Sequence, residues 1–344
     1  MKYIVLLFCI ATFAFIARAG VFYFGTPGEP QRQVVIEVRP GQSFNAVATE
    51  LYKSNIITSF FEFKVLAKLT GYTTKVKTGE YAFNGAMTPM SVLRMLASGI
   101  SISYPITFPE GLNSFEMADM VETSGLGTSQ EFLNTIKDPE LIRQLLGEEL
   151  SSLEGYLFPE TYKLTKFEGV RALVIAMVRN FLKVYEELAP LRPDSNFTRH
   201  QWVILASIIE KETGFEKERE VISSVFHNRL KKNMRLQTDP TVIYGKWVQT
   251  NRPVKNIRKV DLQTKNRYNT YAFRGLPYGP IANPGRNALK AAFQPADTEF
   301  LYFVSRNNGT SKFSETLKEH NQAVRKYQLD QSNRRGKSWR DLSQ

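Results

Sequence analysis

Cysteine and histidine are scarce in this chain of 344 residues, and their scarcity excludes several kinds of site. The one cysteine, Cys9, lies in an apolar N-terminal run, so the chain has no internal disulfide, no cysteine-rich zinc site and no cysteine nucleophile beyond that run. None of the three histidines, His200, His227 and His320, stands near another at the spacing of metal ligands. The G-x-S-x-G elbow of a serine hydrolase is missing as well. We therefore expect neither a metal nor another cofactor.

Acidic residues are fewer than basic ones, at 33 against 45, which gives a formal net charge of +12. A field of this sign favours polyanions, namely nucleic acid, anionic lipid headgroups or an acidic cell-wall polymer. It also suits a surface whose charge serves solubility alone. With 42% apolar residues and many aromatic side chains, the chain can bury a sizeable core and is not disordered as a whole.

The N-terminus carries an apolar run, residues 3–24, that only Arg18 interrupts. This run is long enough to span a bilayer, because a helix rises about 1.5 Å per residue. Its first part, which ends in Ala17-Arg18-Ala19, also resembles a cleavable signal peptide. We favour a retained single-pass anchor over residues 1–24. Both interpretations place the rest of the chain outside the cytoplasm, which argues against nucleic acid as a partner.

Beyond the anchor, the pattern predicts an α+β chain with two folded parts. A linker rich in proline and glycine is expected over residues 25–32. Residues 33–101 then alternate a strand, two helices, a strand and a helix, an order that resembles the LysM-like module of glycan-binding proteins. A small packing domain without a ligand fits the same pattern. The expected strands lie at 34–38 and 79–83, and the expected helices at 44–52, 59–70 and 89–99.

Residues 102–328 are expected to form one larger mixed α+β domain, followed by a basic, disordered tail at 329–344. Asn307-Asn308-Gly309 predicts the turn of a hairpin. The expected strands lie at 102–108, 300–305 and 311–313. The expected helices lie at 114–124, 128–136, 138–147, 168–188, 199–213, 216–232, 284–293 and 315–327, and Asp239-Pro240 is expected to start another, with Asp239 as its N-cap.

One predicted helix carries a carboxyl on its apolar face. Leu205, Ile208 and Ile209 lie three and four residues apart and share that face. At about 100° per residue, Glu212 falls within the face, whereas Glu210 points the opposite way. Apolar surroundings raise the pKa of a carboxyl, as a general acid working near neutral pH requires. The alternative is a solvated charge at the end of a helix.

Seven segments in fixed order resemble the endolytic murein transglycosylase family, the YceG-like proteins. They are EGYLFPETY (154–162), IIEKET (208–213), VFHNRL (225–230), MRLQTDPTVIYG (234–245), YNTY (268–271), GLP (275–277) and PIANPG (280–285). The resemblance covers nearly the whole chain, anchor and LysM-like module included. The chain departs from the family pattern at Glu160, where Asp is usual, at Tyr278, where Pro or a small residue is common, and at Ser311, where many members have His.

The resemblance implies that Glu212, the second glutamate of Glu-Lys-Glu-Thr, is the catalytic residue, with Thr213 in the place of a serine of other lytic transglycosylases. Glu212 would protonate the oxygen between N-acetylmuramic acid and N-acetylglucosamine in peptidoglycan glycan strands. It would then act as a base on the muramic acid 6-hydroxyl, which closes a 1,6-anhydro ring. A second catalytic carboxylate, as in hydrolases, is not required. The resemblance also implies a place in the bacterial inner membrane, with the catalytic domain outside, and an association with cell-wall synthases on nascent strands.

Six further residues are candidates for binding the substrate. Gln237 and Thr238 precede a helix start, where side chains can reach sugar hydroxyl or acetamido groups. Asn269 and Tyr271 combine polarity with an aromatic ring in one loop. The remaining candidates are Glu160 and Tyr244. For each of the six, a purely structural role is the alternative.

Two other functions stay open at this point. A muramidase would add water in place of the 6-hydroxyl, and the products would differ. A catalytically silent peptidoglycan-binding scaffold would rely on the LysM-like module alone, although the intact Glu212 motif argues against it. Binding of nucleic acid is remote, because the chain has no known nucleic-acid motif.

Overall fold

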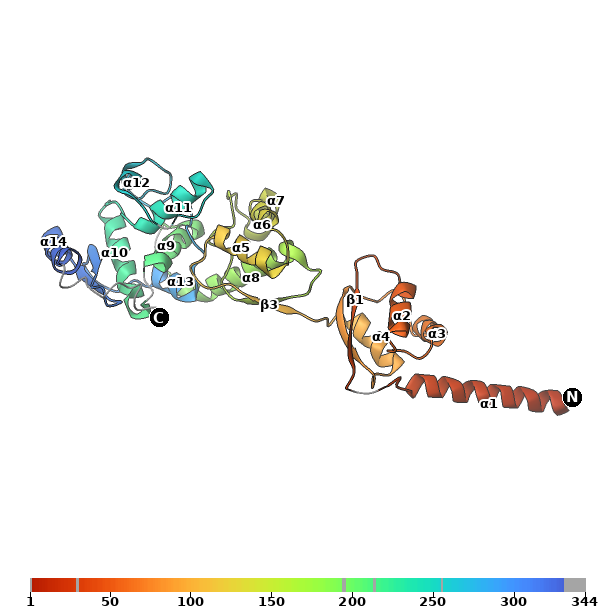
Figure 1. The fold of residues 1–344 in the computed structure, drawn as a ribbon. Helices are drawn as coiled ribbons and strands as arrows, with labels where there is room; N and C mark the ends of the chain where they lie inside the picture. Colours follow the sequence, from red (N-terminus) through yellow and green to blue (C-terminus); the bar gives the residue numbers. More distant parts are fainter. Residues whose placement is uncertain (1, 29–30, 194–195, 213–214, 255, 331–344) are drawn as a thin grey trace. The chain divides into compact units, whose positions relative to one another are not determined.

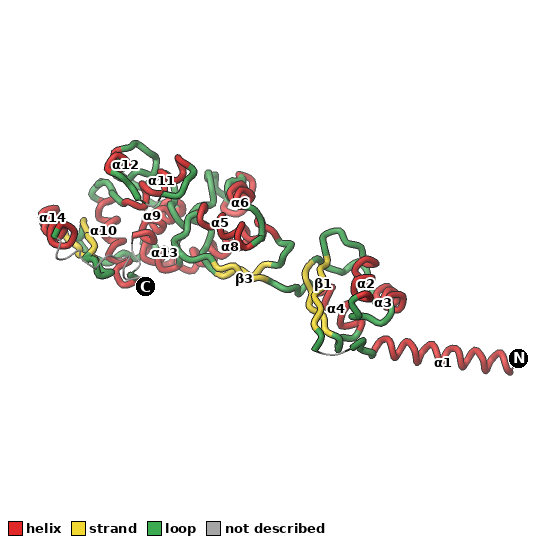
Figure 2. The backbone as a smooth tube through the Cα atoms, in the orientation of Figure 1, coloured by secondary structure: helices red, strands yellow, loops and turns green. Residues whose placement is uncertain are grey.

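The computed structural model of the chain, drawn in Figure 1, describes residues 2–28, 31–193, 196–212, 215–254 and 256–330. It is a mixed α+β structure, as the sequence predicts, with helices joined by short strands and loops (Figure 2). The chain divides into two compact units. The first unit comprises Met1–Ile106 and Lys163–Gly169, and the second comprises Thr107–Tyr162 and Val170–Gln344. The predicted basic tail lies outside the described residues from position 331 onward.

The first unit packs helices against one antiparallel pair of strands. Its elements are α1 (Lys2–Phe24), β1 (Gln33–Val38), α2 (Phe44–Lys53), α3 (Phe60–Leu69), β2 (Gly79–Asn84) and α4 (Pro89–Ser98). In the β1–β2 pair, Gln33 lies opposite Asn84 and Val38 opposite Gly79. Ile36 and Val38 point into the core, as the alternation of a strand requires. The helices α2, α3 and α4 each begin after a hydroxyl residue that accepts a backbone N–H: Ser43, Ser59 and Thr88.

The N-terminal helix α1 is joined to the core of this unit. Phe22, in its last turn, is only 8% exposed and belongs to the same buried cluster as the strands. The Gly25 N–H donates to Val21 O at 2.8 Å, and the Gly28 N–H donates to Gly85 O at 3.1 Å. The first residues of the predicted linker therefore follow the surface of the unit.

The boundary between the units falls within β3 (Tyr104–Thr107) and β4 (Thr161–Leu164). The stretch Lys163–Gly169, which the sequence analysis assigned to the larger domain, belongs to the first unit. Lys166 Nζ lies 2.6 Å from Glu37 Oε2 on β1. An ion pair between residues so far apart in the sequence leaves no local signal, so this excursion of the chain was not predicted.

The second unit surrounds one helix, α9 (Arg199–Glu212). The other helices are α5 (Ser114–Ser124), α6 (Ser129–Thr135), α7 (Pro139–Leu146), α8 (Gly169–Leu188), α10 (Arg219–Lys231), α11 (Asp239–Thr250), α12 (Lys259–Gln263), α13 (Arg286–Phe293) and α14 (Leu317–Val324). Short 3-10 turns lie at Ala189–Leu191 and Glu216–Glu218, and a π turn, Arg325–Leu329, follows α14. The strands β5 (Tyr302–Ser305) and β6 (Ser311–Ser314) form an antiparallel hairpin that contacts α14. Helices α10, α11 and α13 all contact α9.

Helix α9 is the core helix of this unit. Every residue from Trp202 to Ile209 is buried, on all sides of the helix. A helix that is apolar all round is stable only when other elements enclose it. Glu212 is its last residue, so the carboxyl stands where the buried helix ends.

Two short elements were not predicted, and one cap was placed wrongly. Helix α12 has five residues and β4 has four, too few for a periodic signal.

The N-cap of α11 is Thr238, and Asp239 and Pro240 are its first two residues. The prediction of Asp239 as the cap is therefore wrong by one position. The hydroxyl of Thr238 does not cap the helix, because it makes a different hydrogen bond.

The loop 280–285 is held by one buried amide. Asn283 Oδ1 accepts the N–H groups of Gly155 at 2.8 Å and Leu157 at 3.0 Å. Its Nδ2 donates to Leu112 O at 3.1 Å and to Glu154 Oε1 at 2.9 Å. One side chain thus satisfies four polar groups from two other segments of the chain.

The same loop fixes α9. The Ile281 N–H donates to Ser207 Oγ at 3.1 Å, and the Gly285 N–H donates to Glu210 Oε2 at 3.0 Å. A side chain at position 285 would displace the carboxyl of Glu110, which lies against the backbone of Gly285. The loop therefore sets the position of the helix that carries Glu212.

Replacing Asn283 with Ala should destabilise the protein by about 3 kcal/mol, because it leaves the buried N–H groups of Gly155 and Leu157 without an acceptor. Urea unfolding measures the difference. Asn287, which is exposed and bonds only to Glu216 at the surface, gives the matched control. Its replacement by Ala should change the free energy of unfolding by less than about 0.5 kcal/mol. Equal effects at the two positions would contradict the role of Asn283.

Candidate active site

The carboxyl of Glu212 is held out of water at the end of α9. Its pKa is raised to about 7, chiefly by burial and to a lesser extent by the charge of Asp239. A hydrogen bond from the Thr238 hydroxyl to Oε1 and the positive charge of Arg229 act in the opposite direction. Glu212 is therefore protonated in a large fraction of molecules near neutral pH, as the sequence predicts for this side chain. The next residue, Thr213, lies outside the described residues.

The two charged residues before Glu212, Glu210 and Lys211, form hydrogen bonds with backbone groups of neighbouring loops. Glu210 accepts the Gly285 N–H and lies 3.3 Å from Arg219, and Lys211 Nζ donates to Gly111 O at 2.9 Å. Both side chains thus hold loops against α9.

Thr238, whose hydroxyl contacts Glu212, is held in place by two other threonines, Thr241 and Thr270. The Thr238 N–H donates to Thr270 Oγ1 at 3.1 Å, and the Thr241 hydroxyl donates to Thr238 O at 2.7 Å. The hydroxyls of Thr241 and Thr270 lie 2.9 Å apart. All three residues are buried. The hydroxyl of Thr238 is consequently pre-positioned toward Glu212.

Gln237 has a strained backbone beside the site. Its φ angle is +51°, in the left-handed region that a residue with a side chain rarely adopts. Its N–H donates to Thr270 O at 3.3 Å, and its side chain is exposed on the cavity wall. Strain of this kind is often stored at functional sites, where the surrounding structure maintains it.

Tyr271 and Asp239 form a polar pair on the same wall. The Tyr271 hydroxyl donates to Asp239 Oδ1 at 2.6 Å. Burial and this bond to a carboxylate raise the pKa of Tyr271, so it remains a donor. Asp239 is the second carboxylate of the cavity, and it is exposed.

A cavity of about 460 Å³ opens on one side of Glu212. It brings together four of the predicted site residues: Glu212, Gln237, Thr238 and Tyr271. Its far wall comes from the hairpin and α14, through Tyr302 and His320 among others. A second cavity of about 750 Å³ opens next to the same carboxyl, between Glu110, Arg219 and the tip of the hairpin. Glu212 lines both.

Arg229, Tyr302 and His320 are cavity residues that the sequence analysis missed. The Arg229 guanidinium lies 5.3 Å from the centre of the Tyr302 ring, and His320 stacks on the same ring at 5.2 Å. Burial, then the charge of Arg229, lowers the pKa of His320, and its buried Nδ1 has no hydrogen-bond partner within the described residues. Arg229 also has a structural role, since it donates to Leu301 O and Leu236 O.

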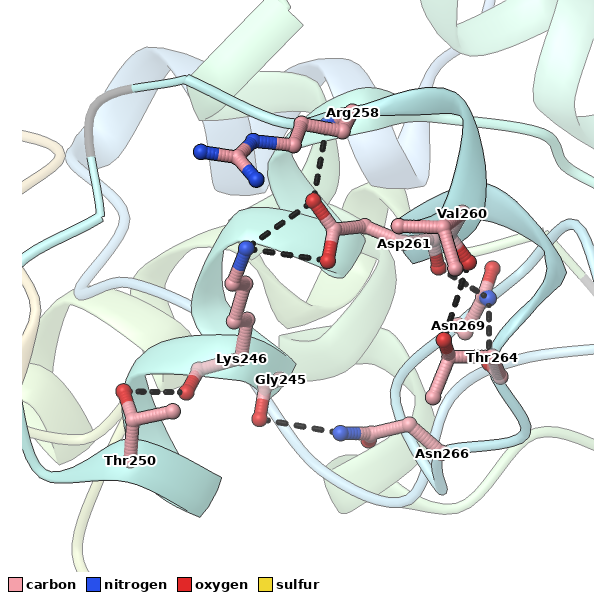
Figure 3. Close-up of polar contacts among 9 residues, drawn as sticks. All are labelled: Gly245, Lys246, Thr250, Arg258, Val260, Asp261, Thr264, Asn266 and Asn269. Atoms are coloured by element: carbon pink, nitrogen blue, oxygen red, sulfur yellow. Dashed lines mark hydrogen bonds and ion pairs between the residues drawn. The ribbon is translucent and has the colours of Figure 1, made fainter.

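Three predicted substrate-binding residues lie away from the cavity. Asn269 is buried, and its amide donates to carbonyl groups at the end of α12, as Figure 3 shows. The hydroxyl of Tyr244 is buried and donates to Glu154 at 2.8 Å. Glu160 is exposed and accepts the N–H of Thr161. The polar groups of Asn269 and Tyr244 are thus used within the protein, and Glu160 is not among the residues that line the cavity.

No group of three or more His, Cys, Asp or Glu side chains that could hold a metal ion occurs among the described residues. The arrangement instead offers a protonated carboxyl, oriented by a hydroxyl and open on two sides. Such an arrangement is chemically suited to a general acid, the kind of group that enzymes cleaving glycosidic bonds use.

The comparisons identify the family. The YceG-like family matches residues 36–326, so the chain belongs to it, and the resemblance found in the sequence is confirmed. An endolytic murein transglycosylase of Bacillus subtilis is 32% identical over 332 residues, which cover 90% of each chain. An endolytic murein transglycosylase of Streptococcus pneumoniae is 26% identical. The match covers 86% of this chain and 58% of the Streptococcus protein.

A crystal structure from Listeria monocytogenes, described as a YceG-like protein, is similar to this chain. The two are 30% identical, with a TM-score of 0.56. The match covers 85% of this chain and 99% of the other.

Replacing Glu212 with Gln should stabilise the protein at mildly alkaline pH. The pKa is about 7 in the folded protein and ordinarily 4.5, so the folded state binds the proton more tightly. The free energy of unfolding of the natural protein should therefore fall as the pH rises from about 4.5 to about 7. Gln has no charge to desolvate and should avoid a loss of about 3 kcal/mol above that range.

Below pH 4.5, where the carboxyl is protonated in both states, the two proteins should be equally stable. Urea unfolding at acidic and at mildly alkaline pH measures the difference. A constant difference across the whole range would show that the buried charge is not its cause.

Proposed function

We propose that this chain is an endolytic murein transglycosylase that cleaves the bond between N-acetylmuramic acid and N-acetylglucosamine within peptidoglycan strands. The observation that carries the proposal is Glu212, a carboxyl with a pKa of about 7 that lines two cavities. A strand that extends to both sides of the acid is cut internally. The named relatives support the same reaction.

In the first step Glu212 acts as the acid. The Thr238 hydroxyl donates a hydrogen bond to Oε1, so the proton of the neutral carboxyl resides on Oε2. Oε2 gives this proton to the glycosidic oxygen as the bond to the muramic acid anomeric carbon breaks. Arg229 and the Thr238 hydroxyl then stabilise the carboxylate that remains, since both lower the pKa of Glu212.

In the second step the same carboxylate acts as the base. It takes the proton of the muramic acid 6-hydroxyl while that oxygen bonds to the anomeric carbon, which forms the 1,6-anhydro ring. The proton returns to Glu212, no water is consumed, and the enzyme is ready for another turn. Because the substrate supplies the nucleophile, Asp239 need not attack the sugar, unlike the second carboxylate of a retaining glycosidase.

The cavity wall supplies groups suited to a sugar. The amide of Gln237 can bond to an acetamido group, and the Tyr271–Asp239 pair offers a donor and an acceptor for hydroxyls. Tyr302 presents an aromatic ring in the same cavity. These residues would orient the strand while Glu212 carries out the chemistry.

The remaining features fit a place at the cell wall. Helix α1 contains Tyr3–Phe24, the one span among the described residues that is long and apolar enough to cross a membrane. We infer that α1 is a single-pass anchor in the bacterial cytoplasmic membrane, with the rest of the chain outside, and that β1 to α4 have a LysM-like, glycan-binding role. From this position the enzyme would act on nascent strands beside the cell-wall synthases.

Purified peptidoglycan treated with the protein should yield strands that end in 1,6-anhydro-muramic acid. Mass spectrometry identifies these ends, because they lack one water relative to hydrolysed ends. Glu212→Gln should lower the rate by about a thousandfold or more, and Glu160→Gln, which changes an exposed carboxylate outside the cavity, should leave it unchanged. Ends that contain the extra water would indicate a muramidase, and wall binding without any cleavage would indicate a scaffold.

Replacing Thr238 with Val should shift the pH dependence of kcat/KM. The hydroxyl of Thr238 lowers the pKa of Glu212, so its removal should raise that pKa above about 7. Activity is lost at high pH when Glu212 loses its proton, and this limb should move to higher pH. Thr238→Ser keeps the hydroxyl and should keep the limb in place. A lower rate with an unmoved limb would assign Thr238 a structural role only.

A further inference from the structure

The first unit carries an apolar surface that its own core does not use. Helix α3 buries Phe63 and Ala67 but leaves a second row of apolar side chains, Phe61, Val65 and Leu69, toward solvent. Phe61 is 72% exposed and Leu69 is 82% exposed. Because these residues are four apart, they form one stripe along α3.

This α3 stripe lies beside the second half of α1. A groove of about 560 Å³ between the two helices is lined by apolar side chains, which include Phe61, Val65 and Leu69 on α3 and Ala14, Ala19 and Tyr23 on α1. At its edge, Arg18 Nε lies 3.0 Å from Glu62 Oε1. Arg18 is the only charged residue within 3–24, so α3 supplies the partner for the one charge of the span.

The position of α3 relative to α1 is fixed by packing. Phe22 of α1 is inserted in the core of the unit, and the helix passes directly into the bonded segment Gly25–Gly28. Arg18 precedes the end of the helix at Phe24 by six residues, or about 9 Å. If α1 crosses a bilayer up to Phe24, the packing brings the α3 stripe to the depth at which α1 leaves the bilayer.

We propose that α3 is an interfacial helix whose stripe inserts among the acyl chains of the leaflet from which α1 emerges, so that the first unit is docked on an anionic membrane. The proposal rests on the membrane anchor inferred above. Lys64 and Lys68 are exposed beside the stripe, where they can contact anionic headgroups. The pairing of Arg18 with Glu62 reduces the cost of a charge near the hydrocarbon.

Spin labels on the full chain in liposomes with anionic lipid test this directly. In a background with Cys9→Ser, single cysteines replace Phe61, Leu69, Ile10 of α1 and Asn45 of α2, all of which are exposed, so that folding is preserved. Collision with oxygen reports acyl chains, and collision with a water-soluble nickel complex reports water. Labels at 61 and 69 should favour oxygen, at a depth of roughly 5–10 Å. The label at 45 should favour nickel.

The label at Ile10 separates two kinds of failure. If it favours oxygen while the labels at 61 and 69 favour nickel, α1 is inserted but the stripe is not, and the docking proposal is overturned. If all labels favour nickel, the membrane anchor itself has failed. Labels at 61 and 69 that are shielded from both reagents and broadened by spin–spin coupling would show a second copy of the chain on the stripe, which also overturns the proposal.

Discussion

The removal of the Glu212 carboxyl from water is the constraint on which the second unit depends. It depends on α9, a helix that is buried from Trp202 to Ile209 and ends at Glu212. It also requires loops that close over that end, and these are held by Asn283 and by the threonines around Thr238. Burial disfavours the ionised form of this carboxyl, so its ionisation at neutral pH destabilises the fold. The same burial keeps a fraction of the acid protonated near neutral pH.

The last three residues of α9 are all charged, but their side chains have different contacts. Glu210 and Lys211 bind backbone groups of neighbouring loops, so their side chains are committed. Glu212 accepts a hydrogen bond from the Thr238 hydroxyl and lines both cavities, which is why we propose it as the acid of the reaction. The strained φ of Gln237 suggests that the cavity wall is likewise built for a function at some cost in stability.

Much of this architecture could be predicted from local patterns. Helices with clear apolar periodicity, such as α5 and α8, begin and end within a residue or two of their expected bounds. The projection of one helix predicts that Glu212 alone lies in apolar surroundings, but the side chain of Glu210 is also buried, at 6% exposed, because Arg219 and the loop at Gly285 pack against it. The direction of Asn269 could not be predicted, because an amide in a polar loop can face a sugar or the backbone equally well. Arg229 and His320 meet Glu212 only through the packing of distant segments, which leaves no local signal.

The excursion of Lys163–Gly169 into the first unit has a consequence for how this protein can be divided. The chain passes between the units three times, after residues 106, 162 and 169. A single protease cut after residue 106 leaves Lys163–Gly169 on the fragment that carries the second unit, so neither fragment contains the whole first unit. A catalytic half expressed from residue 107 would leave Lys166 without Glu37 and Glu80. No single cut in the sequence therefore separates the two units without dividing one of them.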